Sequence, residues 1–170
     1  IEVNDINGGS FSVTAANKNS LYPSNDKKIN HFLALEKKAK LDMLQPYLNF
    51  QKDAQKSRDE LKEFISTARH NGETISALGA STKGNVILQY CDIDSTQIDS
   101  VGEVNANKFG ALTPGSLIPI HSEESVLSKE PDYLMVLPWH FKEFFIKNKK
   151  FNNRRLVFPL PQLEIVTPNN

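Results

Sequence analysis

Three small residues near the middle of the chain have the spacing of a phosphate-binding turn. Gly79, Ser81 and Gly84 occupy the three glycine positions of the dinucleotide-binding fingerprint GxGxxG, with serine at the middle one. A helix that begins there would point free backbone N–H groups and the positive end of its dipole at an anion. The serine hydroxyl could bond a ligand oxygen at the point where glycine normally lets the backbone approach a pyrophosphate.

A carboxylate follows at the place where such a site needs one. Glu103 lies at the end of the next predicted strand, about where the dinucleotide-binding fold places a carboxylate on a ribose diol. The structural alternative is a tight turn at Gly79, with Lys83 in solvent and Glu103 capping or pairing locally. The residues alone leave both interpretations open.

A strand, a helix and a second strand are needed to position these residues. The chain supplies an apolar strand at 75–78, a helix at 83–91 and a strand at 98–104, which together predict a βαβ unit. The continuous apolar run at 133–137 is typical of a central parallel strand buried on both faces. A helix around Phe141 and short strands at 156–158 and 163–166 follow. The pattern predicts an α/β fold with a Rossmann-like, mostly parallel sheet flanked by helices.

The first 72 residues have a different pattern. Apolar and polar residues alternate on both sides of Gly8–Gly9, which predicts a hairpin. Helical periodicity over 27–44 and 47–69 predicts two helices, and the apolar stripe of the second is expected in a core or a domain interface. Two strands are not stable alone, so the hairpin either edges this domain's sheet or completes the sheet of a missing preceding domain. The predicted divisions are a β-ribbon at 1–16, a linker with long helices at 17–72, and a Rossmann-like domain at 73–170.

The amino-acid composition argues against several kinds of partner and binding site. Twenty basic and twenty acidic residues cancel without long blocks of either sign, which argues against a nucleic-acid or anionic-membrane surface. No apolar run approaches the roughly 20 residues of a membrane span. Cys91 is the only cysteine, so no internal disulfide and no cysteine-rich zinc site can form, and a cytoplasmic setting is expected. The sequence starts at Ile1, inside a predicted strand, which suggests a piece of something longer.

Five stretches in fixed order resemble one known family, the sugar C-methyltransferases that act on nucleotide-linked deoxy-sugars. Four are similar to its C-terminal domain: GASTKGNVILQYC at 79–91, EVNANKFG at 103–110, TPGSLIPI at 113–120 and PDYLMVLPWHFK at 131–142. The fifth, NGGSFSV at 7–13, resembles the strand pair that joins the family's middle domain to its C-terminal one. The similarity covers nearly the whole chain and is weakest over 27–70.

The resemblance implies a SAM-dependent methyltransferase for the parent protein and a binding role for this segment. In the family, an N-terminal domain holds zinc through cysteines, and a middle domain binds S-adenosylmethionine (SAM) and supplies a Tyr/Glu/His cluster. The C-terminal domain is a second Rossmann-like unit that helps to hold the nucleotide-sugar. This chain has no cysteine cluster, no glycine-rich methyl-donor motif and no Tyr-x-Glu-His sequence. We therefore expect no cofactor and no catalytic residue here, with the N-terminal and middle domains of the parent chain as partners.

The resemblance also implies substrate-binding residues of three kinds: near the phosphates, near a ribose or sugar hydroxyl, and around the sugar. The residues expected near the phosphates are Ser81, Thr82 and Lys83, and those near a hydroxyl are Glu103 and Asn105. Pro114 is expected in a wall of the site, with Trp139 and His140 facing the sugar. Structural alternatives are packing of Trp139 against the next helix, a cap or surface position for His140, and simple chain reversal at Pro114.

Three functions follow from these interpretations. The first is the substrate-binding domain of a sugar C-methyltransferase. The second is a free-standing Rossmann-like module that binds a nucleotide or coenzyme without catalysis. The third is an interaction domain with a vestigial pocket. Serine in place of the middle glycine favours the first over an ordinary NAD site.

Overall fold

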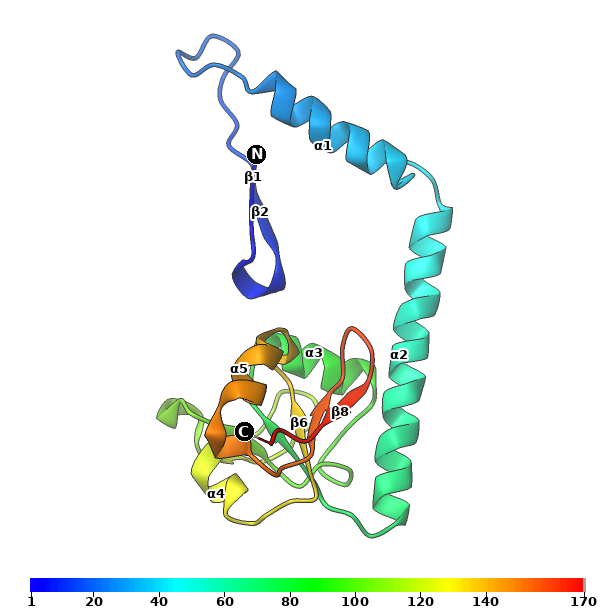
Figure 1. Ribbon diagram of the computed structural model, residues 1–170, viewed down its shortest axis with the longest axis vertical. Coiled ribbons are helices and arrows are strands. Elements are labelled where there is room, and N and C mark those ends of the chain that lie inside the picture. Colours follow the sequence, from blue (N-terminus) through cyan, green and yellow to red (C-terminus); the bar gives the residue numbers. More distant parts are fainter. Residues whose placement is uncertain (170) are drawn as a thin grey trace. The chain divides into compact units, whose positions relative to one another are not determined.

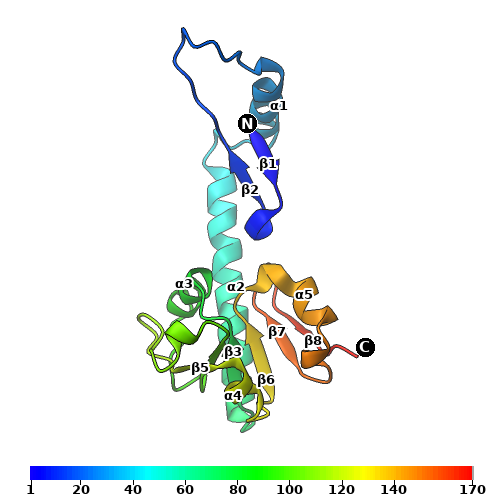
Figure 2. The same cartoon turned by 90° about the vertical axis from the view of Figure 1, so that its left-hand side faces the viewer.

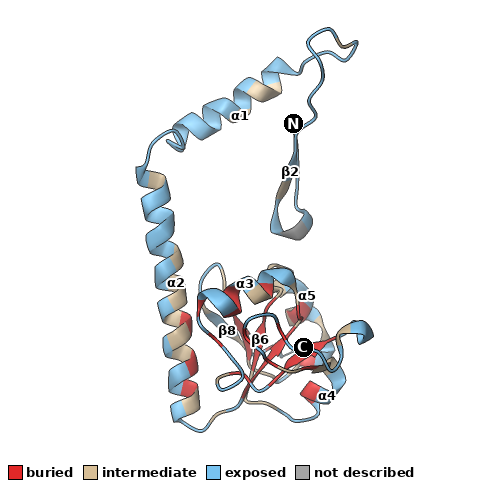
Figure 3. Ribbon diagram, turned by 180° about the vertical axis from the view of Figure 1, so that it is seen from behind, coloured by how far each residue is buried: buried red, intermediate tan, exposed pale blue. Residues whose placement is uncertain are grey.

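The computed structural model describes residues 1–169, in two compact units: Ile1–Ala54, and a second that begins at Gln55 (Figure 1). Helix α2 (Gln45–His70) contributes its first residues to one unit and its remainder to the other. The second unit therefore contains the whole predicted domain at 73–170 and part of the helix before it. Among the described residues, Leu61 is the first that is buried, and Figure 3 shows buried residues on the later part of α2 and on the elements that follow.

The first unit contains a two-stranded ribbon and a helix. Strands β1 (Glu2–Asn4) and β2 (Ser10–Ser12) pair antiparallel, with a 3-10 turn, η1 (Ile6–Gly8), between them. Helix α1 (Asp26–Lys38) starts at Asn25, whose side chain accepts a hydrogen bond from the backbone N–H of Lys28. The prediction that this helix reaches residue 44 is wrong, because Lys40 adopts a left-handed backbone (φ +56°) that ends it.

The second unit is built on a six-stranded sheet with the order β5-β4-β3-β6-β7-β8. Figure 2 shows β3, β6, β7 and β8 side by side. The first five strands in this order are parallel, and β8 is an antiparallel edge. This confirms the predicted mostly parallel α/β sheet. The strands are β3 (Ile75–Leu78), β4 (Val101–Glu103), β5 (Ile120–Ser122), β6 (Tyr133–Val136), β7 (Leu156–Phe158) and β8 (Glu164–Val166).

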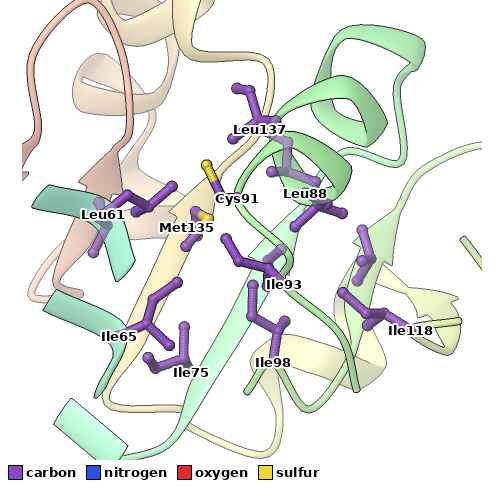
Figure 4. Close-up of a cluster of buried hydrophobic side chains, with 14 of the residues drawn as sticks. Leu61, Ile65, Ile75, Leu88, Cys91, Ile93, Ile98, Ile118, Met135 and Leu137 are labelled. Carbon is purple, nitrogen blue, oxygen red and sulfur yellow. The ribbon is translucent and has the colours of Figure 1, made fainter. Parts of the chain in front are cut away.

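Helices cover both faces of this sheet. On one face, Leu61 and Ile65 of α2 and Leu88 of α3 (Thr82–Tyr90) pack on Ile75 and Met135, and Figure 4 shows this cluster. On the other face, α4 (Glu123–Leu127) and α5 (Lys142–Lys147) pack on the alternate strand residues. The remaining short helical turns are η2 (Ala106–Lys108), η3 (Trp139–Phe141) and η4 (Lys149–Phe151). A sheet buried on both faces explains why β6 is continuously apolar.

The predicted apolar stripe of α2 packs in the core only along its later part. Leu61, Ile65 and Ala68 are buried, whereas Tyr47 and Phe50 are 55% and 73% exposed. The alternative role for those two residues, packing at a domain interface, stays a prediction. Among the described residues, no helix combines the length and the apolar character that crossing a membrane requires.

An arginine joins three strands at the amino-terminal edge of the sheet. Arg155, just before β7, forms ion pairs with Glu73 before β3 and with Asp132 before β6, at 2.9 and 3.2 Å. Its guanidinium also lies over the Tyr133 ring, 4.1 Å from the ring centre. The Asp132 carboxylate accepts hydrogen bonds from the backbone and side chain of Thr74. These contacts fix the amino ends of the strands, so the opposite edge is the one left for loops that bind ligands.

Candidate functional site

The strand order places a topological switch point between β3 and β6. Numbering the six strands by their sequence order gives 3-2-1-4-5-6, and the chain leaves β3 through α3 on one face of the sheet and leaves β6 through α5 on the other. In open α/β sheets, ligands bind outside the carboxyl ends of the strands at this point. The residues that follow β3 and β6 are therefore the best candidates for a site.

The turn after β3 has the conformation that the spacing of its small residues predicts. Gly79 has φ +80°, which lets the chain leave β3 sharply. Ser81 is the N-cap of α3, and its Oγ accepts a hydrogen bond of 3.1 Å from the backbone N–H of Gly84. This bond occupies one acceptor position of the hydroxyl and leaves its hydrogen available as a donor. Thr82 and Lys83, in the first turn of α3, are exposed.

The same turn is in close contact with the end of β6. A Cβ atom added to Gly79 would lie 2.8 Å from Cδ of Pro138, and one added to Gly84 would lie 2.7 Å from Cβ of Leu137. Neither position has room for a side chain without a shift of its neighbour. Gly84 thus packs closely between helix and sheet, which brings the residues after β3 against those after β6.

Glu103 is the last residue of β4, and its carboxylate is held by the protein itself. Oε1 accepts hydrogen bonds from the backbone N–H groups of Val104 (2.8 Å) and Asn105 (3.0 Å). Oε2 accepts from the backbone N–H of Ala80 (3.0 Å) and from the Lys108 ammonium (3.1 Å). Burial raises the pKa of Glu103, but the hydrogen bonds and the Lys108 charge outweigh it and leave the pKa below its ordinary value. Glu103 thus connects the turn after β3 to the loop after β4.

Lys108 is the residue at this site that sequence reasoning missed. Besides Glu103, its Nζ donates to the backbone carbonyl of Ala80 at 2.9 Å. Ala80 directly precedes the N-cap of α3, so the ammonium lies beside the first turn of that helix. The sequence held one signal for this residue: Lys108 is the first cation after Glu103.

Trp139 and His140 follow β6 in the turn η3. Trp139 is half-buried and packs against the apolar clusters on both faces of the sheet. The Nδ1 atom of His140 is buried and has no hydrogen-bond partner among the residues that the structure describes. Burial lowers the pKa of His140, and the positive charge of Lys83 lowers it further. Lys83 and His140 lie on segments that are in contact, because Gly84 packs on Leu137 and Gly79 packs on Pro138.

The structure places Asn105 close to this group and Pro114 away from it. Asn105 caps η2, and its side chain accepts a hydrogen bond from the backbone N–H of Asn107. The carbonyl of Pro114 accepts a hydrogen bond of 2.9 Å from Gln89, in the last turn of α3. Ser81 is at the other end of this nine-residue helix, which is roughly 13 Å long. The structure therefore does not bring Pro114 into one group with Ser81.

The group as a whole is suited to holding an anion. It combines the N-terminal turn of α3, the ammonium groups of Lys83 and Lys108, and the nearby imidazole of His140. Zinc does not fit the residues here, because the described chain holds no cluster of three His, Cys, Asp or Glu side chains, and Cys91 is buried.

Comparison with known proteins agrees with this architecture. The family model described as the C-methyltransferase C-terminal domain matches residues 5–161. The chain is 28% identical over 169 residues to C-methyltransferase NovU of Streptomyces niveus. That alignment covers 96% of this chain and 39% of the relative, so the chain spans well under half the length of NovU. The chain belongs to the C-methyltransferase C-terminal domain family.

Proposed function

We propose that this chain is the nucleotide-sugar-binding domain of a SAM-dependent sugar C-methyltransferase. The observation that carries the proposal is the contact, where the strand order reverses, between the turn after β3, which holds Ser81 and Lys83, and the end of β6, which leads into His140. A nucleotide-sugar offers a diphosphate to the first turn of α3, while its sugar would extend toward Trp139 and His140. Thr82 and Asn105 are further candidates for polar contacts with it.

The chemistry of methyl transfer belongs, in this proposal, to other parts of a longer chain. Methylation of a carbon next to a keto group needs a base to remove a proton and a partner for the enolate charge. It also needs the methyl donor held in line with that carbon. We assign SAM, zinc and the acid–base residues to the N-terminal and middle domains of the parent. The short span of this chain relative to NovU supports that division. The domain described here contributes positioning of the substrate, in the cytoplasm.

Amide NMR of the chain tests the proposal directly. We expect a thymidine-diphosphate sugar to shift the amide signals of Ser81, Lys83 and Glu103. Shifts of these signals by NADH or SAM, with none from the nucleotide-sugar, would overturn the proposal and favour a coenzyme-binding module.

Substitution of Lys83 tests the role of its charge. We expect Lys83→Ala to weaken diphosphate binding about tenfold, since a hydrogen bond to a charged group contributes about 1.5 kcal/mol or more. Thermal unfolding should change little, because Lys83 is exposed. A large loss of thermal stability would mark Lys83 as structural instead. Lys129→Ala is the matched control: Lys129 is exposed and precedes β6, at the amino-terminal edge of the sheet.

A further inference from the structure

We propose that Lys108 binds a phosphate oxygen of the ligand and that Glu103 positions Lys108, in place of accepting hydrogen bonds from a ribose diol. This inference rests on the proposed function, and it names which chemical group of the nucleotide meets the end of β4.

The hydrogen bonds of Glu103 leave no room for a diol. An ionised carboxylate has about four lone-pair positions. The backbone N–H groups of Ala80, Val104 and Asn105, together with the Lys108 ammonium, supply four donors at 2.8–3.1 Å. The Glu103 side chain is also only 8% exposed. A ribose hydroxyl could reach Glu103 only by displacing a donor that holds the turn in place.

Lys108, unlike Glu103, has a hydrogen-bonding position left for a ligand. Its ammonium carries three N–H donors, and the described residues give it two acceptors, the Ala80 carbonyl and Glu103 Oε2. The side chain is 41% exposed, so a third donor is available to a ligand. Because Nζ is fixed 2.9 Å from the carbonyl that precedes the N-cap of α3, this donor lies beside the first turn of that helix.

The chemistry of this position selects for an acceptor. An ammonium group cannot accept a hydrogen bond, so it recognises phosphate or carbonyl oxygens. Placed next to the N-terminus of α3 and near Lys83, it fits a phosphate best. The end of β4 would then distinguish phosphorylated from unphosphorylated nucleosides, and it would not distinguish ribose from deoxyribose.

Calorimetry on the wild-type chain and three variants tests this assignment. The ligands are uridine diphosphate, its 2′-deoxy counterpart, and uridine. We expect Lys108→Gln, which keeps hydrogen-bond donors but loses the charge, to weaken both diphosphates about tenfold and to leave uridine unchanged. Glu103→Gln should weaken the two diphosphates by the same factor. Lys129→Gln, the control at the amino-terminal edge, should change nothing.

Two outcomes overturn the inference while leaving the proposed function intact: unchanged diphosphate affinity in Lys108→Gln, or a selective loss of the ribose form over the deoxyribose form in Glu103→Gln. Absence of any nucleotide binding by the wild-type chain overturns the proposed function itself. An NMR measurement on the wild-type chain tests the inference even if a variant fails to fold. The Lys108 Nζ resonance should shift on addition of uridine diphosphate but not of uridine, and a Lys108 resonance that stays fixed with the diphosphate bound also overturns the inference.

Discussion

At the scale of single residues, serine at the middle fingerprint position has a structural use. Ser81 caps α3 through its Oγ, which a glycine could not do. Loss of a serine cap to alanine costs about 1 kcal/mol, whereas glycine at the same position costs only a few tenths. The backbone at Ser81 is extended, so neither substitution is strained.

Ser81→Ala is therefore expected to lower the thermal midpoint by about 2–4 °C, and Ser81→Gly by less. Thermal unfolding of both variants followed by circular dichroism measures the difference. A midpoint of Ser81→Ala equal to that of the wild-type chain would show that the capping bond does not contribute to stability.

His140 gives the site a predictable response to pH. Its pKa in the folded chain is lowered, chiefly by burial and then by Lys83, so below a pH of about 6.5 the unfolded state binds more protons than the folded state. The stabilising contribution of neutral His140 is complete above that pH and is lost as the pH falls through the folded-state pKa. Denaturant unfolding at pH 7 and pH 5 should show a decrease in stability that is smaller in His140→Gln.

An NMR titration of His140 separates the two causes. Lys83→Ala should raise the pKa of His140 but leave it below the ordinary histidine value, since burial is the larger cause. An unchanged pKa in this variant would contradict the proximity of Lys83 and His140.

At the scale of elements, the contact between α3 and the end of β6 is the tightest in the site. Gly84→Ala would place a methyl group 2.7 Å from Cβ of Leu137. Overpacking of this kind typically costs 1–3 kcal/mol, which for a chain of this size lowers the thermal midpoint by roughly 2–12 °C. Measured in a double-mutant cycle, Gly84→Ala and Leu137→Ala should be less destabilising together than the sum of the two separate changes. If the two changes in the free energy of unfolding simply add, α3 shifts away from Leu137 without cost.

Which elements could be predicted depended on how local their signals were. Strand β6 was predictable because it is a continuous apolar run. Helix α3 was predictable because a glycine with positive φ and a capping residue lie just before it in the sequence. The end of α1 was not, since the left-handed backbone at Lys40 has no glycine to indicate it.

The candidate site was predictable in position more than in detail. Ser81 and Lys83 follow β3 and Glu103 ends β4, and the adjacent parallel strands bring their carboxyl ends together. The partners of Glu103 depend on how the loop at 104–108 folds, and spacing does not encode the donor at Ala80. Likewise, the ion pair between Arg155 and Glu73 joins residues far apart in sequence, and a single sequence does not reveal such a contact.

At the scale of the whole molecule, the two units differ in how much they bury. No described side chain of the first 54 residues is buried, and the elements that lie wholly within this unit are a two-stranded ribbon with its 3-10 turn and a 13-residue helix. Neither is stable in water without a surface to pack on. Val3 and Phe11, which pair across the ribbon, are exposed apolar residues that a partner could cover.

Hydrogen exchange should make this difference visible. We expect amides within residues 1–54 to exchange almost as fast as in an unfolded peptide, and those of β3 and β6 to be protected up to global unfolding. Strong protection of 1–54 in the present chain would contradict the need for a partner.

The contact of Gly79 with Pro138 has a consequence for how a ligand enters. The residues after β3 contact those after β6 in the folded chain, since a Cβ added at Gly79 would lie 2.8 Å from Cδ of Pro138. The turn proposed to bind the nucleotide is therefore in place once the protein has folded, so binding needs little further ordering of the backbone there. On the proposed function, we therefore expect little movement of these turns when a nucleotide binds.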